Sequence, residues 1–182
     1  RSTLSSSSAA SDVYKRQIIG TTLIKKMRAI YIIYGAIMTL GLVSFWYIAI
    51  SLGTFGVTIL AVLVILSDVG GYIVGRAVGG RKFWPAISPK KTWSGIIAGW
   101  VLAALFGYIL IQNLGTILLI PIFIVVVIGA QLGDIAESWV KRRTNVKDSS
   151  DLIPGHGGVL DRFDGFIGGA LVLAITAPLF LN

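Results

Sequence analysis

The chain has 182 residues, of which 55% are hydrophobic, and its mean hydropathy is +0.84. These values exclude an ordinary soluble domain and place the chain among membrane proteins. The absence of cysteine excludes disulfide bonds and cysteine-ligated metal sites. The formal net charge of +8 indicates contact with the anionic headgroups of a lipid bilayer, and we expect no nucleic-acid partner.

The first 17 residues are rich in serine and lack apolar periodicity. We expect residues 1–17 to be a disordered or non-native tail and residues 18–182 to form one transmembrane domain. Because the sequence does not begin with methionine, we also expect it to be truncated at its N-terminus.

Five stretches are apolar and long enough to cross a bilayer, which requires roughly 20 helical residues. They are residues 29–50, 54–76, 93–113, 115–136 and 163–181, of which the last is short and begins at a charged end. Lipid cannot pair with backbone polar groups, so each stretch is predicted to be a helix. The predicted fold class is an all-α integral membrane protein, a polytopic helical bundle of about five transmembrane helices.

Basic residues are confined to alternate connections between these stretches. They precede the first, separate the second from the third, and separate the fourth from the fifth, whereas the connections at 51–54 and 112–115 carry no charge. Five alternating spans therefore place every basic cluster on one side, which the positive-inside rule makes cytoplasmic. We expect a protein of the plasma (inner) membrane with its functional site on the cytoplasmic side.

Six of the eight acidic residues lie between positions 134 and 164. Asp134, Glu137, Ser138 and Lys141 follow one another at helical spacing and share one face. A solvated helix end would also explain this pattern. However, the helix is apolar up to Gly133, which places Asp134 at membrane depth, where carboxylates are costly and usually functional.

A second acidic pair, Asp161 and Asp164, opens the last apolar stretch. Carboxylates at a helix start also complement the helix dipole, so simple capping is the alternative. Together with Asp134 these residues predict a site for a hard cation. Mg²⁺ binds one or two carboxylates together with phosphate oxygens and water, and we expect Mg²⁺ here, with or without a second cation.

A glycine-rich turn, P-G-H-G-G at residues 154–158, lies between the two acidic groups. Glycines let successive backbone N–H groups face an anion, and basic residues surround the turn: Lys141, Arg142, Arg143, Lys147 and Arg162. His156 is expected either to contact a phosphate or base or to bond only to the backbone. The acidic residues can bind a metal ion, and the backbone amides and basic side chains can bind phosphates. This combination predicts phosphoryl or nucleotidyl transfer.

A further component lies between the second and third apolar stretches. Asp68 shares a helical face with Gly71 and Gly75, and small residues at this spacing allow close helix packing, within one chain or in a homodimer. Farther along, Pro89 interrupts the helix and Lys90 and Lys91 follow it at the membrane surface. These lysines are expected to clamp an anionic headgroup or triphosphate, the alternative being snorkelling lysines beside a helix cap.

Two segments together resemble a known family signature. Residues 138–148 read S-W-V-K-R-R-T-N-V-K-D and residues 154–164 read P-G-H-G-G-V-L-D-R-F-D. They are similar to S-x-x-K-R-x4-K-D and P-G-H-G-G-x-x-D-R-x-D of the phosphatidate cytidylyltransferase (CDP-diglyceride synthase) family, with every fixed position met. The resemblance covers approximately residues 55–182. The chain departs from the family at Ser94, where Glu is usual, and at Val69, where Thr is usual.

The resemblance implies a nucleotidyltransferase of phospholipid synthesis that converts CTP and phosphatidate into CDP-diacylglycerol and pyrophosphate with Mg²⁺ in a bilayer. It implies that Asp134 and Asp161 ligate the metal, with Asp148 and Asp164 as ligands or orienting neighbours. The full expected catalytic set is Asp134, Lys141, Arg142, Lys147, Asp148, Asp161, Arg162 and Asp164. The expected substrate-binding set is Ser88, Lys90, Lys91, Ser138, His156, Gly157 and Gly158.

Two other functions are compatible with parts of this pattern. A CTP-dependent lipid kinase of the dolichol or phytol kinase type has related phosphate-binding blocks but transfers the γ-phosphoryl group. A noncatalytic ion or lipid transporter would use buried acids such as Asp68 and Asp134, but it would leave the glycine-rich turn and its basic surroundings unexplained.

Overall fold

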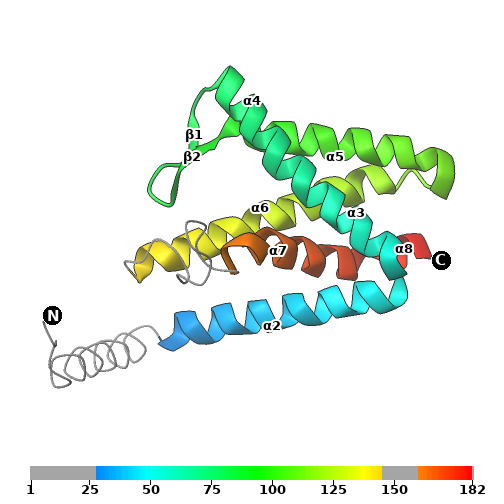
Figure 1. Ribbon diagram of the computed structural model, residues 1–182, viewed down its shortest axis with the longest axis horizontal. Helices are drawn as coiled ribbons and strands as arrows, with labels where there is room; N and C mark the ends of the chain where they lie inside the picture. The colour runs from blue at the N-terminus through cyan, green and yellow to red at the C-terminus, as the bar shows by residue number, and fades with distance from the viewer. Residues whose placement is uncertain (1–27, 145–159, 182) are drawn as a thin grey trace, which may run out of the picture. The chain divides into compact units, whose positions relative to one another are not determined.

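The computed structural model describes residues 28–144 and 160–181 (Figure 1). The chain divides into two units, Arg1–Ile37 and Met38–Asn182. The described part of the first unit is the beginning of a helix, α2. All other elements belong to the second unit, and the site described below lies entirely within it.

The described residues are almost entirely helical. The elements are α2 (Arg28–Ser51), α3 (Gly53–Ile65), η1 (Leu66–Gly70), α4 (Gly71–Val78), β1 (Lys82–Trp84), β2 (Ser88–Thr92), α5 (Trp93–Leu114), α6 (Leu119–Arg143), α7 (Leu160–Thr176) and α8 (Pro178–Leu181). Within this part of the chain, four helical stretches are long and apolar enough to cross a membrane: Arg28–Ser51, Gly53–Val78, Trp93–Leu114 and Leu119–Arg143. The first four predicted spans and the all-α membrane fold class are therefore confirmed.

The fifth predicted span, residues 163–181, is wrong as a single helix. α7 ends at Thr176, and α8 is a separate turn that starts at Pro178. Proline has no backbone N–H and disfavours helical geometry in the residue before it, here Ala177, so the helix is interrupted at this point. The apolar part of α7, Phe163–Thr176, is shorter than the other spans.

A two-stranded antiparallel hairpin, which was not predicted, connects α4 to α5. Lys82 pairs with Thr92 and Trp84 pairs with Ser88. The chain leaves α4 through Gly79 and Gly80, whose φ angles of 66° and 100° strongly favour glycine. At the end of the hairpin, the Thr92 hydroxyl accepts a hydrogen bond from the backbone N–H of Gly95 and caps α5.

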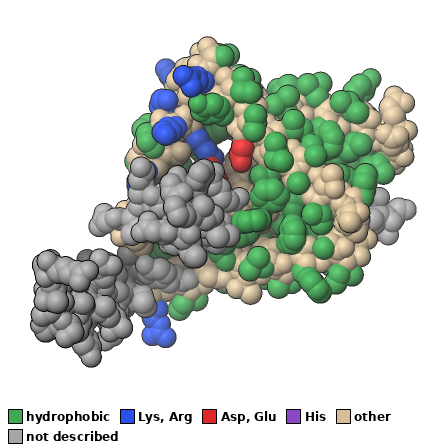
Figure 2. Space-filling view, in the orientation of Figure 1, with side chains coloured by type: hydrophobic (Ala, Val, Ile, Leu, Met, Phe, Trp, Pro, Cys, Tyr) green, Lys and Arg blue, Asp and Glu red, His purple; other side chains and the backbone are tan. Residues whose placement is uncertain are grey.

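The core of the second unit is built from apolar side chains of α3, α6 and α7. Leu60, Leu63, Phe123 and Leu173 are among the most deeply buried residues. Many other apolar side chains face outward, and Figure 2 shows them covering much of the visible helical surface. Such exposure is expected where lipid, and not water, surrounds the helices.

Glycines bring α6 and α7 into direct backbone contact, and the two helices lie side by side in Figure 1. A Cβ atom built on Gly168 would lie only 3.0 Å from the Cα atom of Gly133. This close approach matters for the site, because Gly133 precedes Asp134 and Asp164 lies one turn before Gly168 on α7.

Candidate active site

The hairpin and the C-terminal end of α6 meet at one end of the second unit. The Nε atom of Arg142 donates a hydrogen bond to the backbone carbonyl of Ile87 over 3.4 Å. In addition, Lys91 of β2 forms an ion pair with Asp134 of α6. These contacts confirm that the basic connection between the second and third spans lies on the same side as the basic end of the fourth span.

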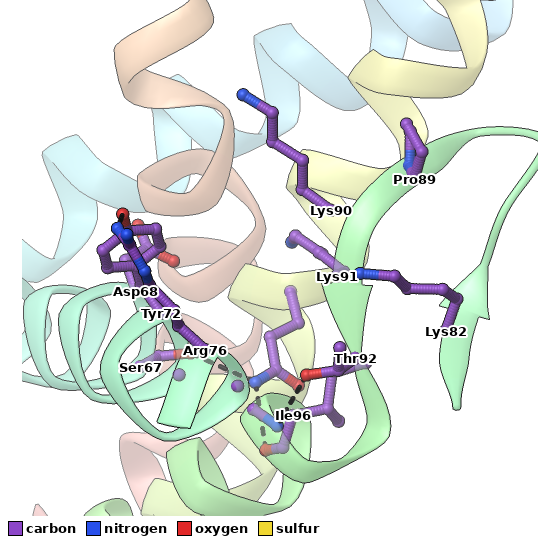
Figure 3. A pocket seen from close by; sticks show the side chains of 14 residues that line it. Ser67, Asp68, Tyr72, Arg76, Lys82, Pro89, Lys90, Lys91, Thr92 and Ile96 are labelled. Carbon is purple, nitrogen blue, oxygen red and sulfur yellow. Dashed lines mark hydrogen bonds between the residues drawn. The ribbon is translucent and has the colours of Figure 1, made fainter. Parts of the chain in front are cut away.

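A cavity of about 510 Å³ opens beside this meeting point. Its walls come from η1, α4, the hairpin, the start of α5 and the middle of α6 (Figure 3). The lining residues are Ser67, Asp68, Gly71, Tyr72, Gly75, Arg76, Lys82, Pro89, Lys90, Lys91, Thr92, Gly95, Ile96 and Gln131. Asp68, Lys90 and Lys91, which the sequence placed in one further component of the site, all line this cavity.

The cavity walls are strongly cationic. Lys82, Lys90 and Lys91 project from the hairpin, whereas Asp68, Tyr72 and Arg76 come from the facing helix (Figure 3). The remaining lining residues carry no charge, so four cations face a single carboxylate. Figure 2 also shows Lys and Arg side chains gathered over this end of the unit. A net positive cavity of this size suits a ligand that carries several negative charges, such as a phosphate ester or a nucleotide.

The helix carrying Asp68 changes its winding at the cavity. Leu66–Gly70 forms the π-helical segment η1 between the α-helical segments α3 and α4. Single π-turns inside α-helices are uncommon and occur frequently at functional sites. The spacing of Asp68, Gly71 and Gly75 predicts a shared helical face here, but it does not signal the extra residue in the turn.

Side-chain hydrogen bonds centred on Gln131 connect the helices that line the cavity. Trp100 Nε1 donates to Gln131 Oε1 over 3.0 Å, and Gln131 Nε2 donates to Ser67 Oγ over 3.2 Å. The same nitrogen donates to the backbone carbonyl of Ile96 over 3.4 Å. This network joins three membrane-spanning helices directly below the cationic walls.

Acidic side chains cluster where α6 and α7 touch. The Asp164 carboxyl group interacts with those of Asp134 and Glu137, and it accepts a hydrogen bond of 2.6 Å from the backbone N–H of Gly165. Glu137 is only 2% exposed, and its carboxylate lies 3.5 Å from the ammonium group of Lys141. The Asp134–Lys91 ion pair links this acidic cluster to the cavity wall.

The cytidylyltransferase family profile matches residues 8–180 of this sequence. The chain belongs to the cytidylyltransferase family. It is 45% identical over 118 residues to a phosphatidate cytidylyltransferase of Brucella suis biovar 1 (strain 1330), covering 63% of this chain and 43% of the relative. It is 39% identical over 140 residues to a phosphatidate cytidylyltransferase of Bacillus subtilis (strain 168), covering 72% of this chain and 52% of the relative.

A third relative, the phosphatidate cytidylyltransferase of Staphylococcus haemolyticus (strain JCSC1435), is 45% identical over 106 residues, which are 56% of this chain and 41% of the relative. The chain thus spans about half the length of the curated relatives it matches. The family resemblance inferred from the two signature segments is confirmed by these matches.

The structure brings several of the predicted residues together and leaves others apart. Asp134, Asp164 and Lys141 meet in the acidic cluster, and the Ser138 hydroxyl lies 3.5 Å from a carboxylate oxygen of Asp134. Arg142 binds the hairpin backbone. Ser88 pairs with Trp84 in the hairpin and is not one of the residues that line the cavity.

The remaining predicted residues are not tested by the structure. Lys147, Asp148, His156, Gly157 and Gly158 lie outside the described residues. Asp161 and Arg162 lie in the first turn of α7, but their side chains also fall outside the described part. Asp151, a further acid of the same segment, is likewise outside it.

The metal site stays a prediction. Within residues 28–144 and 160–181, no three acidic or histidine side chains are arranged as a complete metal site. The described donors nevertheless have suitable chemistry, because the carboxylates of Asp134 and Asp164 supply oxygen ligands of the kind that Mg²⁺ prefers.

Four residues that line the cavity were not predicted from the sequence: Ser67, Tyr72, Lys82 and Gln131. Gln131 carried a usable signal, since it is the first polar residue of α6, twelve positions into an otherwise apolar run. A polar side chain at such a depth needs a partner on a neighbouring helix. Tyr72 and Lys82 carried none, because their role depends on where the hairpin folds.

Ser94, the position at which the family usually has Glu, has a structural role in this chain. Its hydroxyl donates to the backbone carbonyl of Gly79 over 2.5 Å and lies 3.0 Å from the Thr92 hydroxyl. The residue therefore connects the start of α5 to Gly79, the first residue after α4.

Proposed function

We propose that this protein transfers the cytidylyl group of CTP to phosphatidate and releases CDP-diacylglycerol and pyrophosphate. The observation that carries the proposal is the junction of a cationic cavity with a carboxylate cluster, joined by Lys91 and Asp134, at one end of membrane-spanning helices. The names of the curated relatives support the choice of CTP and phosphatidate as substrates.

The position of the site accounts for how two such different substrates meet. The cavity lies at the end of the helices, where the bilayer surface is expected, and water-borne CTP reaches it from the aqueous side. Phosphatidate enters sideways from the headgroup layer with its acyl chains still in lipid. We further propose that the membrane is the plasma (inner) membrane and that the site faces the cytoplasm, because the basic connections share one side.

The reaction in this proposal is a single displacement at phosphorus. An oxygen of the phosphatidate phosphate forms a bond to the α-phosphorus of CTP as the bond to the β-phosphate oxygen breaks, and pyrophosphate leaves with that bonding pair. A phosphate monoester has a second pKa of about 6 and is therefore mostly dianionic near neutral pH. The nucleophile needs no general base under these conditions.

The main barrier is then the repulsion between two polyanions. Arg76, Lys90 and Lys91 lie on the cavity wall, where they can neutralise nonbridging and leaving oxygens. When Lys91 binds a phosphate, its ion pair with Asp134 opens and that carboxylate becomes available to another cation.

Mg²⁺ fits the donors on the acidic side of the site. Asp134 and Asp164 would hold it, together with the predicted ligands Asp161 and Asp148. When bound, the ion supplies positive charge that stabilises the phosphate oxygens in the transition state. Asp134→Asn is expected to lower the rate by about 10²–10³-fold, the usual cost of losing one such electrostatic group.

The proposal is tested with the whole chain reconstituted in liposomes that contain phosphatidate. CTP labelled at the α-phosphorus is expected to label the lipid, and CTP labelled at the γ-phosphorus is expected to release labelled pyrophosphate only. Lipid labelled from the γ position would replace the proposal with a lipid kinase. No labelling and no CTP-dependent pyrophosphate release would refute it.

A further inference from the structure

Gln131 is a buried polar residue in the apolar part of α6, and its exposed fraction is 8%. Its side chain lies below the cavity and contributes to the cavity lining. An amide in this position is costly unless its donors and acceptor are paired. The structure pairs all of them with groups on two other helices.

The orientation of the amide follows from the chemistry of its partners. The Trp100 indole only donates, so Gln131 Oε1 must face it. The Ile96 carbonyl only accepts, so Gln131 Nε2 must face that side. The Ser67 oxygen therefore accepts from Nε2, and the hydroxyl proton of Ser67 is left to be donated toward the cavity that Ser67 lines.

Ser67 belongs to the π-helical segment η1, and the next residue is Asp68. Gly99 leaves room for the network, since a Cβ atom there would lie 2.9 Å from Gln131 Nε2 and 3.1 Å from Ser67 Oγ. The π-turn is thus held by the hydrogen bond from Gln131 to Ser67, and its next residue, Asp68, lines the cavity.

We propose that Gln131 is a positioning residue for substrate binding. It holds the π-turn through Ser67, and the turn in this shape directs the Ser67 hydroxyl toward a phosphate oxygen of the substrate in the cavity and the Asp68 carboxylate toward a hydroxyl or amino donor of that substrate. The inference rests on the proposed function, under which that substrate is CTP or phosphatidate. The donors and the acceptor of the Gln131 amide are already paired, so Gln131 acts through the turn and not by hydrogen bonding to either substrate.

The test compares Gln131→Leu with Asp68→Asn and with the double variant, each as the whole chain in liposomes. The leucine keeps the approximate size of the side chain and removes its three hydrogen bonds. KM is measured for CTP and for phosphatidate separately, which distinguishes the two sources of phosphate. Binding of each substrate is also measured as a ligand-induced shift in melting temperature, so that the result does not depend on turnover.

Gln131→Leu is expected to raise KM for one substrate by about 10- to 100-fold, by analogy with the cost of losing a residue that orients a metal ligand, with a smaller change in kcat. Asp68→Asn is expected to raise KM for the same substrate, and the double variant is expected to be no worse than Asp68→Asn alone. Gln112→Leu, the same substitution at an exposed position near the end of α5, is the matched control and should behave as wild type.

Two results would overturn the inference. Effects that multiply in the double variant would mean that Gln131 does not act through Asp68. A lower melting temperature of the unliganded protein with unchanged KM and ligand-induced shifts would mean that Gln131 serves packing alone. If Gln131→Leu does not fold, Trp100→Phe takes its place: it removes the indole donor to Gln131 and is combined with Asp68→Asn in the same way. A wild-type chain that binds substrate without transferring the cytidylyl group would refute the proposed function. The comparison of the single and double variants could still be made from the ligand-induced shifts in melting temperature.

Discussion

Replacing Gly168 by alanine tests whether the contact between α6 and α7 sets the geometry of the acidic cluster. The new Cβ atom would lie 3.0 Å from the Cα atom of Gly133 and from the carbonyl carbon of Gly129, and it would be closer still to the Gly129 carbonyl oxygen. All three are backbone atoms, so no side-chain rotation can relieve the overlap. The two helices must move apart.

The size of the effect follows from these distances. Carbon atoms pack best at about 3.5–4.0 Å, so the helices must separate by roughly 0.5–1 Å. Overpacking of this kind costs about 1–3 kcal/mol of stability. Asp134 and Asp164 lie on opposite sides of the contact, and a displacement of about 1 Å between reacting groups lowers a rate by about 100-fold.

The assay is transfer of α-labelled cytidylyl groups to phosphatidate in liposomes, with melting temperature measured in parallel. Gly165→Ala on the same helix is the matched control, because its Cβ atom would lie 3.6 Å or more from its neighbours. Gly168→Ala should lose about 100-fold in rate by the argument above, and Gly165→Ala should remain active. Equal losses in the two variants, or full activity in Gly168→Ala, would refute the reasoning.

Three further predictions concern orientation, chemistry and stability. In a chain without native cysteine, Ser51→Cys and Ala86→Cys should label from opposite sides of the membrane, and labelling from one side would contradict the span order. Asp134→Asn should lower Mg²⁺-dependent turnover by about 10²–10³-fold while membrane insertion is unchanged, and near-normal turnover would exclude Asp134 as a ligand. Ser94→Ala loses the hydrogen bond to Gly79 and should lower the free energy of unfolding by about 1 kcal/mol, whereas an unchanged denaturation midpoint would show that the bond contributes nothing.

Hydrophobicity carried most of the fold prediction. A helix in lipid must pair its own backbone groups, so composition located both ends of α5 to within about one residue, whereas α6 runs past the predicted apolar stretch into its charged end. Composition does not predict where a single proline interrupts a helix, and the last predicted span therefore continued past Pro178. It also does not report the β1–β2 hairpin, because the pairing of Lys82 with Thr92 depends on the glycine turn that precedes it.

The site was predictable where charge was unusual for its surroundings. Asp68, Asp134 and Lys91 stand out in or beside apolar sequence, and the structure places them around one cavity and one ion pair. Spacing along one helix predicted that Glu137 and Lys141 would share a face, and they do. It did not predict the Lys91–Asp134 pair, because that contact joins two elements whose approach depends on tertiary packing.

The connection between α5 and α6 has a consequence for how the protein reaches the membrane. α5 ends at Leu114, its C-cap Gly115 has a φ of 69° that terminates the helix, and α6 begins at Leu119. The turn between them carries no charge, whereas moving a lysine or aspartate across the bilayer centre costs about 2.5–3.5 kcal/mol on insertion scales. The two helices can therefore enter the bilayer together as a pair, without carrying the charged groups of the hairpin or the acidic cluster across it.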